Sequence, residues 1–102
     1  MDKKIKDGMV AVLVSPRHGA GWYSWHGIEE LLYDPKLVEM VEEKTSVEAI
    51  ELYCEEVYGE HYYGGAEDLE VAWVSVGTPF RIDEYGGAET IEIRDEINWM
   101  VA

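Results

Sequence analysis

The chain has little cysteine and no long apolar run. Cys54 is its single cysteine, so no intramolecular disulfide can form within the 102 residues. No apolar stretch approaches the roughly 18 residues that a membrane-spanning helix needs. The charged segment Met1–Gly8 also lacks the apolar core of a signal peptide. These absences predict a cytoplasmic protein without a membrane partner.

Basic residues are scarce as well. Eight Lys and Arg oppose 22 Asp and Glu, which gives a formal net charge of −14. Because nucleic-acid binding needs clustered Lys and Arg, the composition argues against a direct nucleic-acid partner. It favours a basic protein partner, and a solvated acidic surface is the simpler alternative.

Length and the first apolar run indicate how the fold begins. A chain of 102 residues fits a single domain, residues 1–102, with its own core. The polar lead-in, residues 1–8, is expected to be partly mobile. Met9–Val14 is unbroken Met, Val, Ala and Leu, which predicts a strand covered on both faces.

Helices are expected after this strand. Residues 28–33 predict a helical turn, and Asp34-Pro35 begins a helix that ends near Lys44. Thr45 and Glu48 have the spacing of a capping box, with Thr45 as the cap. The next helix ends before Gly59. Its apolar stripe comprises Val47, Ile50, Cys54, Val57 and Tyr58.

Three strands complete the predicted fold. Residues 69–76 form the first, and the Gly86-Gly87 turn joins residues 80–85 to 89–94 in a hairpin. The apolar segment 97–102 is expected to dock on the domain or on a second subunit. The element order predicts an α+β domain: a mostly antiparallel sheet of about four strands, with two to three helices inserted between strand 1 and strand 2.

The residues that could carry chemistry gather in Ser15–Gly27, directly after the first strand. This loop holds one of the three arginines, two of the three histidines and two of the four tryptophans. A second loop, residues 60–66, adds two tyrosines and two glycines. If the loops meet, they form an aromatic pocket that suits a flat ring carrying phosphate, or an arginine-rich partner loop. The alternative is that the tryptophans close the core. The residues predicted to bind the ligand are Arg17, His18, Gly19, Gly21, Trp22, Trp25, Tyr63, Gly64 and Arg81.

Catalytic and metal sites are less favoured. Arg17-His18-Gly19 resembles the Arg-His-Gly of histidine phosphatases, which would make His18 a nucleophile beside a phosphate-binding arginine. The resemblance covers three residues, and no second motif surrounds His61 or Arg81. The histidine spacing matches no metal site, and Gly19-Ala20-Gly21 lacks the third glycine of a dinucleotide loop. We therefore expect no catalytic residue, no metal and no cofactor, and Cys54 is expected to be a structural thiol.

Longer segments are similar to a family of small bacteriophage and prophage proteins of unknown function. The segments that carry this resemblance are Ser15–Trp22, Tyr62–Leu69 and Trp73–Tyr85. It implies a phage accessory protein that acts in the cytosol of a bacterial host. Small proteins of this kind often inhibit host machinery, and some sequester nucleotide signals of antiviral defence.

Residues and resemblance together predict a non-enzymatic, phage-type binding protein that forms a homo-oligomer. Its ligand would be phosphate-bearing or nucleotide-like, with Arg17 and His18 as anion donors and Trp22 or Trp25 as a stacking wall. Such a protein could act as a counter-defence sponge. The alternative is an inhibitor that mimics nucleic acid, using the acidic region 29–60 against a basic host protein. A third hypothesis is phosphate-ester hydrolysis at His18.

Overall fold

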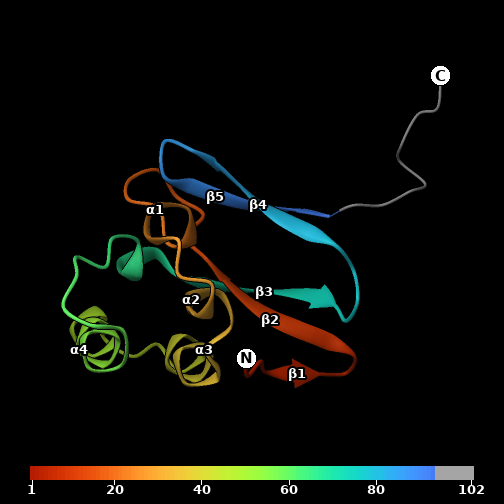
Figure 1. Cartoon of the computed structure of the whole chain (residues 1–102), viewed down its shortest axis with the longest axis horizontal. Coiled ribbons are helices and arrows are strands. Elements are labelled where there is room, and N and C mark those ends of the chain that lie inside the picture. The colour runs from red at the N-terminus through yellow and green to blue at the C-terminus, as the bar shows by residue number, and fades with distance from the viewer. Residues whose placement is uncertain (94–102) are drawn as a thin grey trace.

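The computed structural model describes residues 1–93 and confirms the α+β class (Figure 1). These residues form five antiparallel strands in two sheets, rather than a single sheet of about four strands. The helices lie between the second and third strands, which are strands 1 and 2 of the prediction, because an additional short strand precedes them. In chain order the elements are β1 (Ile5–Lys6), β2 (Met9–Val14), α1 (Tyr23–His26), α2 (Glu30–Tyr33), α3 (Pro35–Glu42), α4 (Val47–Tyr58), the 3-10 turn η1 (Ala66–Asp68), β3 (Glu70–Ser75), β4 (Phe80–Tyr85) and β5 (Ala88–Ile93).

The first sheet has the order β1-β2-β3, with β2 in the centre. Its short edge strand corrects the prediction that residues 1–8 are only a polar lead-in. Ile5 and Lys6 pair with β2 through a tight turn at Asp7 and Gly8, whose φ angles are 52° and 76°. Positive φ at both central positions is the geometry that Asp-Gly favours in hairpins, so the dipeptide itself indicated this strand.

Apolar side chains cover both faces of the central sheet, as the sequence of β2 predicted. Ala11 and Leu13 face α3 and α4, whereas Val12 and Val14 face the β4–β5 hairpin. The molecule is therefore layered, with helices α3 and α4 on one side of β2–β3 and the hairpin on the other (Figure 1). Successive residues of a strand point to opposite faces, so an unbroken apolar strand suits a central layer.

The helix starts follow capping chemistry. Asp34 caps α3 by accepting hydrogen bonds from the amides of Lys36 and Leu37, which confirms the prediction. At α4 the predicted cap is wrong by one residue. Ser46, not Thr45, is the N-cap, and its hydroxyl accepts from the Ala49 amide at 3.3 Å.

The apolar stripe of α4 is narrower than the sequence predicted. Ile50 and Cys54 are buried, and Val47 and Tyr58 are partly covered. Val57 is 52% exposed and lies outside the stripe. A helix that packs on a sheet along one side buries a narrow seam, so the residues at its margins reach solvent.

The β4–β5 hairpin turns at Gly86-Gly87, as predicted, and pairs Phe80 with Ile93 at its open end. Phe80, Ile82 and Ile91 pack against the central sheet. The predicted end of this hairpin at residue 94 and the docking of residues 97–102 lie outside the described residues.

Candidate functional site

Three loops that are distant in the sequence meet beside α1, at the turn end of the hairpin (Figure 1). The Gly19 amide donates to the Gly86 carbonyl at 2.9 Å. Gly64 packs so closely on Ala20 that a Cβ at position 64 would overlap the Cβ of Ala20. The two loops singled out in the sequence therefore do converge, and the β4–β5 turn joins them. The loop cluster, as we name it, comprises residues 15–27, 62–65 and 84–87.

A buried carboxylate holds the loop cluster together. Glu89 is 1% exposed, and its Oε1 accepts from the amide of Ser15 at 3.0 Å and from its hydroxyl at 3.3 Å. Its Oε2 accepts from the amide and the hydroxyl of Ser24, both at 2.7 Å. The amide of Ser24 lies in the first turn of α1, where the N-cap residue, Trp22, has no side-chain acceptor. Glu89 thus caps α1 from another element and fixes its place on the hairpin.

Two aromatic residues of the predicted pocket lie in the core. Trp22 is fully buried and its indole donates to the Leu31 carbonyl at 2.9 Å. Tyr63 is 2% exposed and donates its hydroxyl to the Gly59 carbonyl at 2.6 Å. Neither ring has a face free for a ligand, so the stacking role expected of Trp22 is wrong. At these two positions the core-closure alternative describes the structure, because both rings pack within the main hydrophobic cluster.

The two predicted anion donors are exposed at the rim of the cluster. The Arg17 side chain is 71% exposed, and its Nη1 lies 3.1 Å from Oδ1 of Asp68. The His18 ring stands edge-on to the Tyr85 ring, with 6.0 Å between centroids. A ligand could reach both residues, but the charge of Arg17 is already matched by a neighbouring carboxylate.

The predicted glycines shape the cluster, whereas Arg81 lies apart from it. Gly21 and Gly64 allow close packing, since a Cβ on either would overlap a neighbouring side chain. Gly19 has a φ of 137° and open space around it. Arg81 binds Glu92 across the hairpin at 2.9 Å. At about 3.3 Å per residue it lies about 17 Å along the strand from the Gly86 turn, so it does not join the loop residues.

Large aromatic rings are exposed around the loop cluster. Trp25 is 56% exposed, Tyr62 75% and Tyr85 81%. Each ring contacts a residue of the loop cluster. The Trp25 ring lies on Gly21, the Tyr62 ring lies beside Gly64, and the Tyr85 ring lies against His18. Of the aromatic residues predicted to bind, Trp25 is the one that the structure leaves open to a partner.

Glu84 ties one of these rings to the hairpin. Its Oε1 accepts from the Trp25 indole at 3.2 Å and from the Gly87 amide at 2.8 Å. The Gly87 amide, and after it the Trp25 indole, lower the pKa of Glu84 below its ordinary value of 4.5. The cluster therefore presents an ionised carboxylate directly beside an exposed indole.

Glu84 and Glu89 were not among the predicted site residues, although the alternation of side chains along each strand indicates them. Phe80, Ile82 and Glu84 alternate along β4, and Ile91 and Glu89 do the same along β5. An acidic residue on the apolar parity of a strand is unusual, because burial of an unpaired charge is unfavourable. Such a residue indicates a polar partner within the fold. Glu89 is buried against Ser15 and Ser24. Glu84 is exposed, and its partners are the Trp25 indole and the Gly87 amide.

A second polar cluster lies at the start of α3. Asp34 Oδ2 accepts from the hydroxyls of Tyr53 at 2.8 Å and Tyr58 at 2.6 Å. Burial, and then the bond to Asp34, raise the pKa of both phenols. These groups border a cavity of about 530 Å³ that Glu30 also lines. The carboxylate of Asp34 is already satisfied by helix amides and phenols, so the cluster has a structural role.

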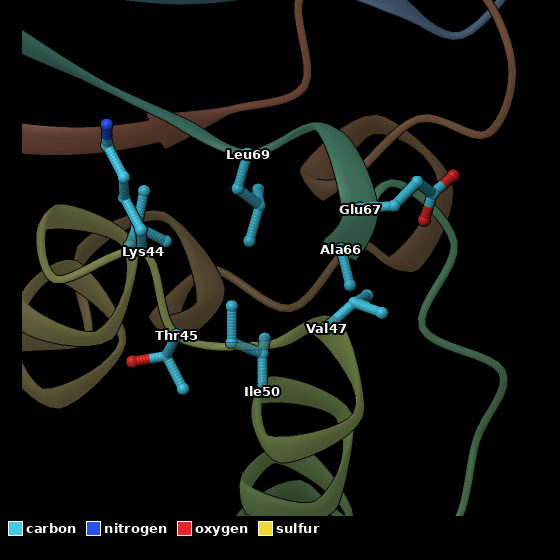
Figure 2. Close-up of a pocket in the computed structure, with 8 residues that line it drawn as sticks. Lys44, Thr45, Val47, Ile50, Ala66, Glu67 and Leu69 are labelled. Carbon is cyan, nitrogen blue, oxygen red and sulfur yellow. The ribbon is translucent and has the colours of Figure 1, made fainter.

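A smaller cavity of about 230 Å³ lies between the α3–α4 turn and η1 (Figure 2). Val47, Ile50 and Leu69 form its apolar lining, and the charged groups of Lys44 and Glu67 point away from it (Figure 2). Thr45 also lines the cavity, so its wall is a mixture of apolar and polar groups that indicates no particular ligand.

The remaining chemistry-bearing residues are structural. Cys54 is fully buried, and burial raises the pKa of its thiol to about 12, which keeps it unreactive. His26 Nε2 lies 3.2 Å from the Gly64 carbonyl and its ring packs on Trp22 and Tyr63. Within residues 1–93, no three His, Cys, Asp or Glu side chains are grouped to hold a metal ion.

Comparison with known proteins gives no relative. The chain matches no family model, no curated protein and no solved structure. No helix in residues 1–93 has the length and apolar character to cross a membrane.

Proposed function

We propose that this protein is a non-enzymatic binding domain that recognises a basic surface of another protein through the loop cluster. The observation that carries the proposal is the exposure of Trp25, Tyr62 and Tyr85 around one rigid, glycine-rich loop. Tyr and Trp are the residues that dominate protein interfaces, because they supply large, rigid, amphipathic contact area.

Charge supports a basic partner. The protein carries a formal charge of −14, and the exposed Trp25 indole is hydrogen-bonded to the carboxylate of Glu84. A negative surface attracts a basic partner over long distances and accelerates its association. Arginine and lysine side chains also bind the faces of aromatic rings. The proposal thus adopts the basic protein partner of the alternative hypothesis from the sequence, and moves the contact from the acidic helices to the loop cluster.

The loop cluster has the rigidity that recognition requires. Glu89 accepts four hydrogen bonds that join the loop after β2, α1 and the hairpin. Gly87 packs against the carbonyl of Gly19 with no room for a side chain. A surface that is ordered before binding loses less conformational entropy when a partner arrives.

A second candidate is the phosphate-bearing or nucleotide-like ligand predicted from the sequence. It is favoured by the exposure of Arg17 and His18 on the same loop, with the Tyr85 ring against His18. In that case Tyr85 or Trp25 would stack on the ligand, since Trp22 is buried. The ion pair between Arg17 and Asp68 opposes this candidate, because an anion would have to displace a carboxylate.

Titration calorimetry with defined probes distinguishes these candidates. The probes are an arginine-rich peptide and a panel of mono-, di- and cyclic nucleotides. The loop variant carries Trp25→Ala, Tyr62→Ala and Tyr85→Ala, and the helix variant carries Glu51→Lys, Glu55→Lys and Glu56→Lys. We expect the peptide to bind, the loop variant to lose binding, and the helix variant to keep binding with a weaker salt dependence.

Two results would overturn the basic-partner proposal. If the helix variant abolishes peptide binding and the loop variant does not, the acidic helices are the recognition surface. If nucleotides bind and Arg17→Ala removes that binding while the peptide gives no heat, the anion site is the function.

A further inference from the structure

We propose that Trp25 and Glu84 form a binding site for a guanidinium group, and that an arginine side chain of the basic partner occupies it. This inference rests on the proposed function and names the chemical group that the loop cluster selects. It depends on three properties of the pair: an exposed ring face, a fixed ring orientation and a carboxylate oxygen left open.

The ring is both accessible and held in place. The Trp25 side chain is 56% exposed, yet its indole nitrogen is bound to Glu84 and its ring edge lies on Gly21. Gly21 has no Cβ, and a Cβ there would overlap the indole. The indole therefore keeps one orientation and offers a face to solvent. Among aromatic side chains, tryptophan binds cations most strongly.

The carboxylate stands at the edge of that ring with one oxygen occupied. Both donors, the Trp25 indole and the Gly87 amide, bind Oε1 of Glu84. Within residues 1–93, Oε2 of Glu84 forms no hydrogen bond with another residue. A planar group stacked over the indole could therefore direct an N–H toward Oε2.

Guanidinium fits this geometry better than ammonium does. It is planar, stacks on aromatic faces, and is more weakly hydrated than the lysine ammonium. Its N–H groups lie in the guanidinium plane, which runs parallel to the indole ring. They point outward past the ring edge, where a carboxylate can accept from them. Arg17 is the only arginine or lysine in the sequence of the loop, and its guanidinium pairs with Asp68 rather than with Glu84.

NMR titration of the ¹⁵N-labelled protein tests the site. The probes are three peptides of equal length in which glycine alternates with arginine, lysine or citrulline. We expect the indole N–H signal of Trp25 to shift with the arginine peptide, and the affinity for arginine to exceed that for lysine by about 3- to 10-fold. Citrulline, which has the shape of arginine without its charge, should not bind.

Variants separate this inference from the proposed function. Glu84→Gln keeps an acceptor for the indole and removes the charge, and Glu55→Gln on α4 is the matched control for net charge. Glu84→Gln should erase the preference for arginine over lysine, and Glu55→Gln should preserve it. Trp25→Phe should reduce the preference.

The outcomes are distinct. If Tyr62→Ala and Tyr85→Ala weaken peptide binding but arginine and lysine peptides bind equally to the wild type, the guanidinium site is wrong and the proposed function stands. If no basic peptide binds the wild-type protein, both are wrong. If Glu84→Gln leaves the arginine preference intact, the site lies elsewhere on the surface.

Discussion

At the scale of single residues, Glu89 organises the site. A carboxylate at 1% exposure is tolerated here because four donors surround it. Within residues 1–93 no buried side-chain nitrogen or oxygen lacks a hydrogen-bond partner. Glu89 also connects the two parts of the chain that flank the helices, since its own amide donates to the Ser15 carbonyl at 2.8 Å.

Glu89→Gln should destabilise the protein by about 2 kcal/mol, because hydrogen bonds to a charged group are lost and the new amide N–H₂ would face the backbone N–H of a serine, a donor opposite a donor. Urea unfolding at neutral pH measures the change. Glu92→Gln, an exposed position on the same strand, should change stability much less, because solvent screens its ion pair. Equal effects for the two variants would show that the buried network contributes nothing.

Glu84 should give a pH dependence of defined sign. Its pKa in the folded state lies below 4.5, so its contribution to stability is complete above that value and is lost as pH falls through the folded pKa. Trp25→Phe removes one of its two donors and should move the pKa part of the way back toward 4.5. NMR titration of the Glu84 carboxyl carbon measures this, and an unchanged pKa in Trp25→Phe would contradict the indole contact.

The sequence brought two chemistry-bearing loops to attention, and the structure places them together, but the sequence did not predict which of their side chains are exposed. Trp22 and Trp25 occur three residues apart in the same loop, yet Trp22 is fully buried and Trp25 is 56% exposed. Composition and spacing do not distinguish them. The difference arises from tertiary contacts: Trp22 fills the core beside Leu31, and Trp25 lies over Gly21.

At the scale of elements, backbone conformation decides how the loops pack. Gly87 and Gly77 have nearly equal φ angles, 84° and 82°, but different surroundings. A Cβ on Gly87 would overlap the carbonyl of Gly19, whereas a Cβ on Gly77 would meet nothing within 4 Å. A comparison of alanine variants at these two glycines therefore separates the cost of backbone strain from the cost of a steric overlap.

Gly77→Ala should destabilise the protein by about 1 to 2 kcal/mol, which is the cost of positive φ for a residue with a Cβ. Gly87→Ala should have that effect and a further 1 to 3 kcal/mol, roughly, from overpacking. Thermal or urea unfolding compares the variants. Equal losses of unfolding free energy in the two variants would mean that the β4–β5 turn is not in close contact with the loop at Gly19.

The end of α3 offers a stabilising change. Lys44 has a φ of 57°, and the Thr45 amide donates to the Met40 carbonyl at 2.9 Å, as in a helix end that favours glycine. Lys44→Gly should raise the free energy of unfolding by about 1 kcal/mol, because the strain of positive φ disappears. Lys44→Ala keeps the Cβ and should not stabilise. A loss of stability in Lys44→Gly would contradict this account.

Local chemistry made several elements predictable. The Asp34-Pro35 pair fixed the start of α3, and Gly86-Gly87 fixed the hairpin turn. The adjacent hydroxyl residues Thr45 and Ser46 left the start of α4 uncertain by one residue, since either can cap a helix. The hydrophobic pattern does not indicate the hairpin at Asp7-Gly8, because the strand before this turn has only two residues.

At the scale of the whole molecule, the layers explain why the loops converge. The hairpin packs on one face of β2–β3 and the helices on the other, so the end of β2 meets the start of β5 where Ser15 binds Glu89 (Figure 1). The sequence predicted the α+β class from the order of its elements. It did not predict the separation into two sheets, which depends on the hairpin folding over β2 rather than pairing beside it.

The net charge of −14 makes the basic-partner account dependent on salt. Association with a basic peptide should weaken steadily as salt screens the charges, over a Debye length of about 10 Å at 0.1 M. Contacts with aromatic rings depend less on salt, so some affinity should persist at high ionic strength.

Chemical-shift mapping of the ¹⁵N-labelled protein with the arginine peptide tests the central claim most directly. The account predicts shifts at the Trp25 indole and at the amides of residues 18–27, 62–65 and 84–87, with α3 and α4 little changed. Shifts confined to α3 and α4, with the loop cluster unaffected, would contradict it.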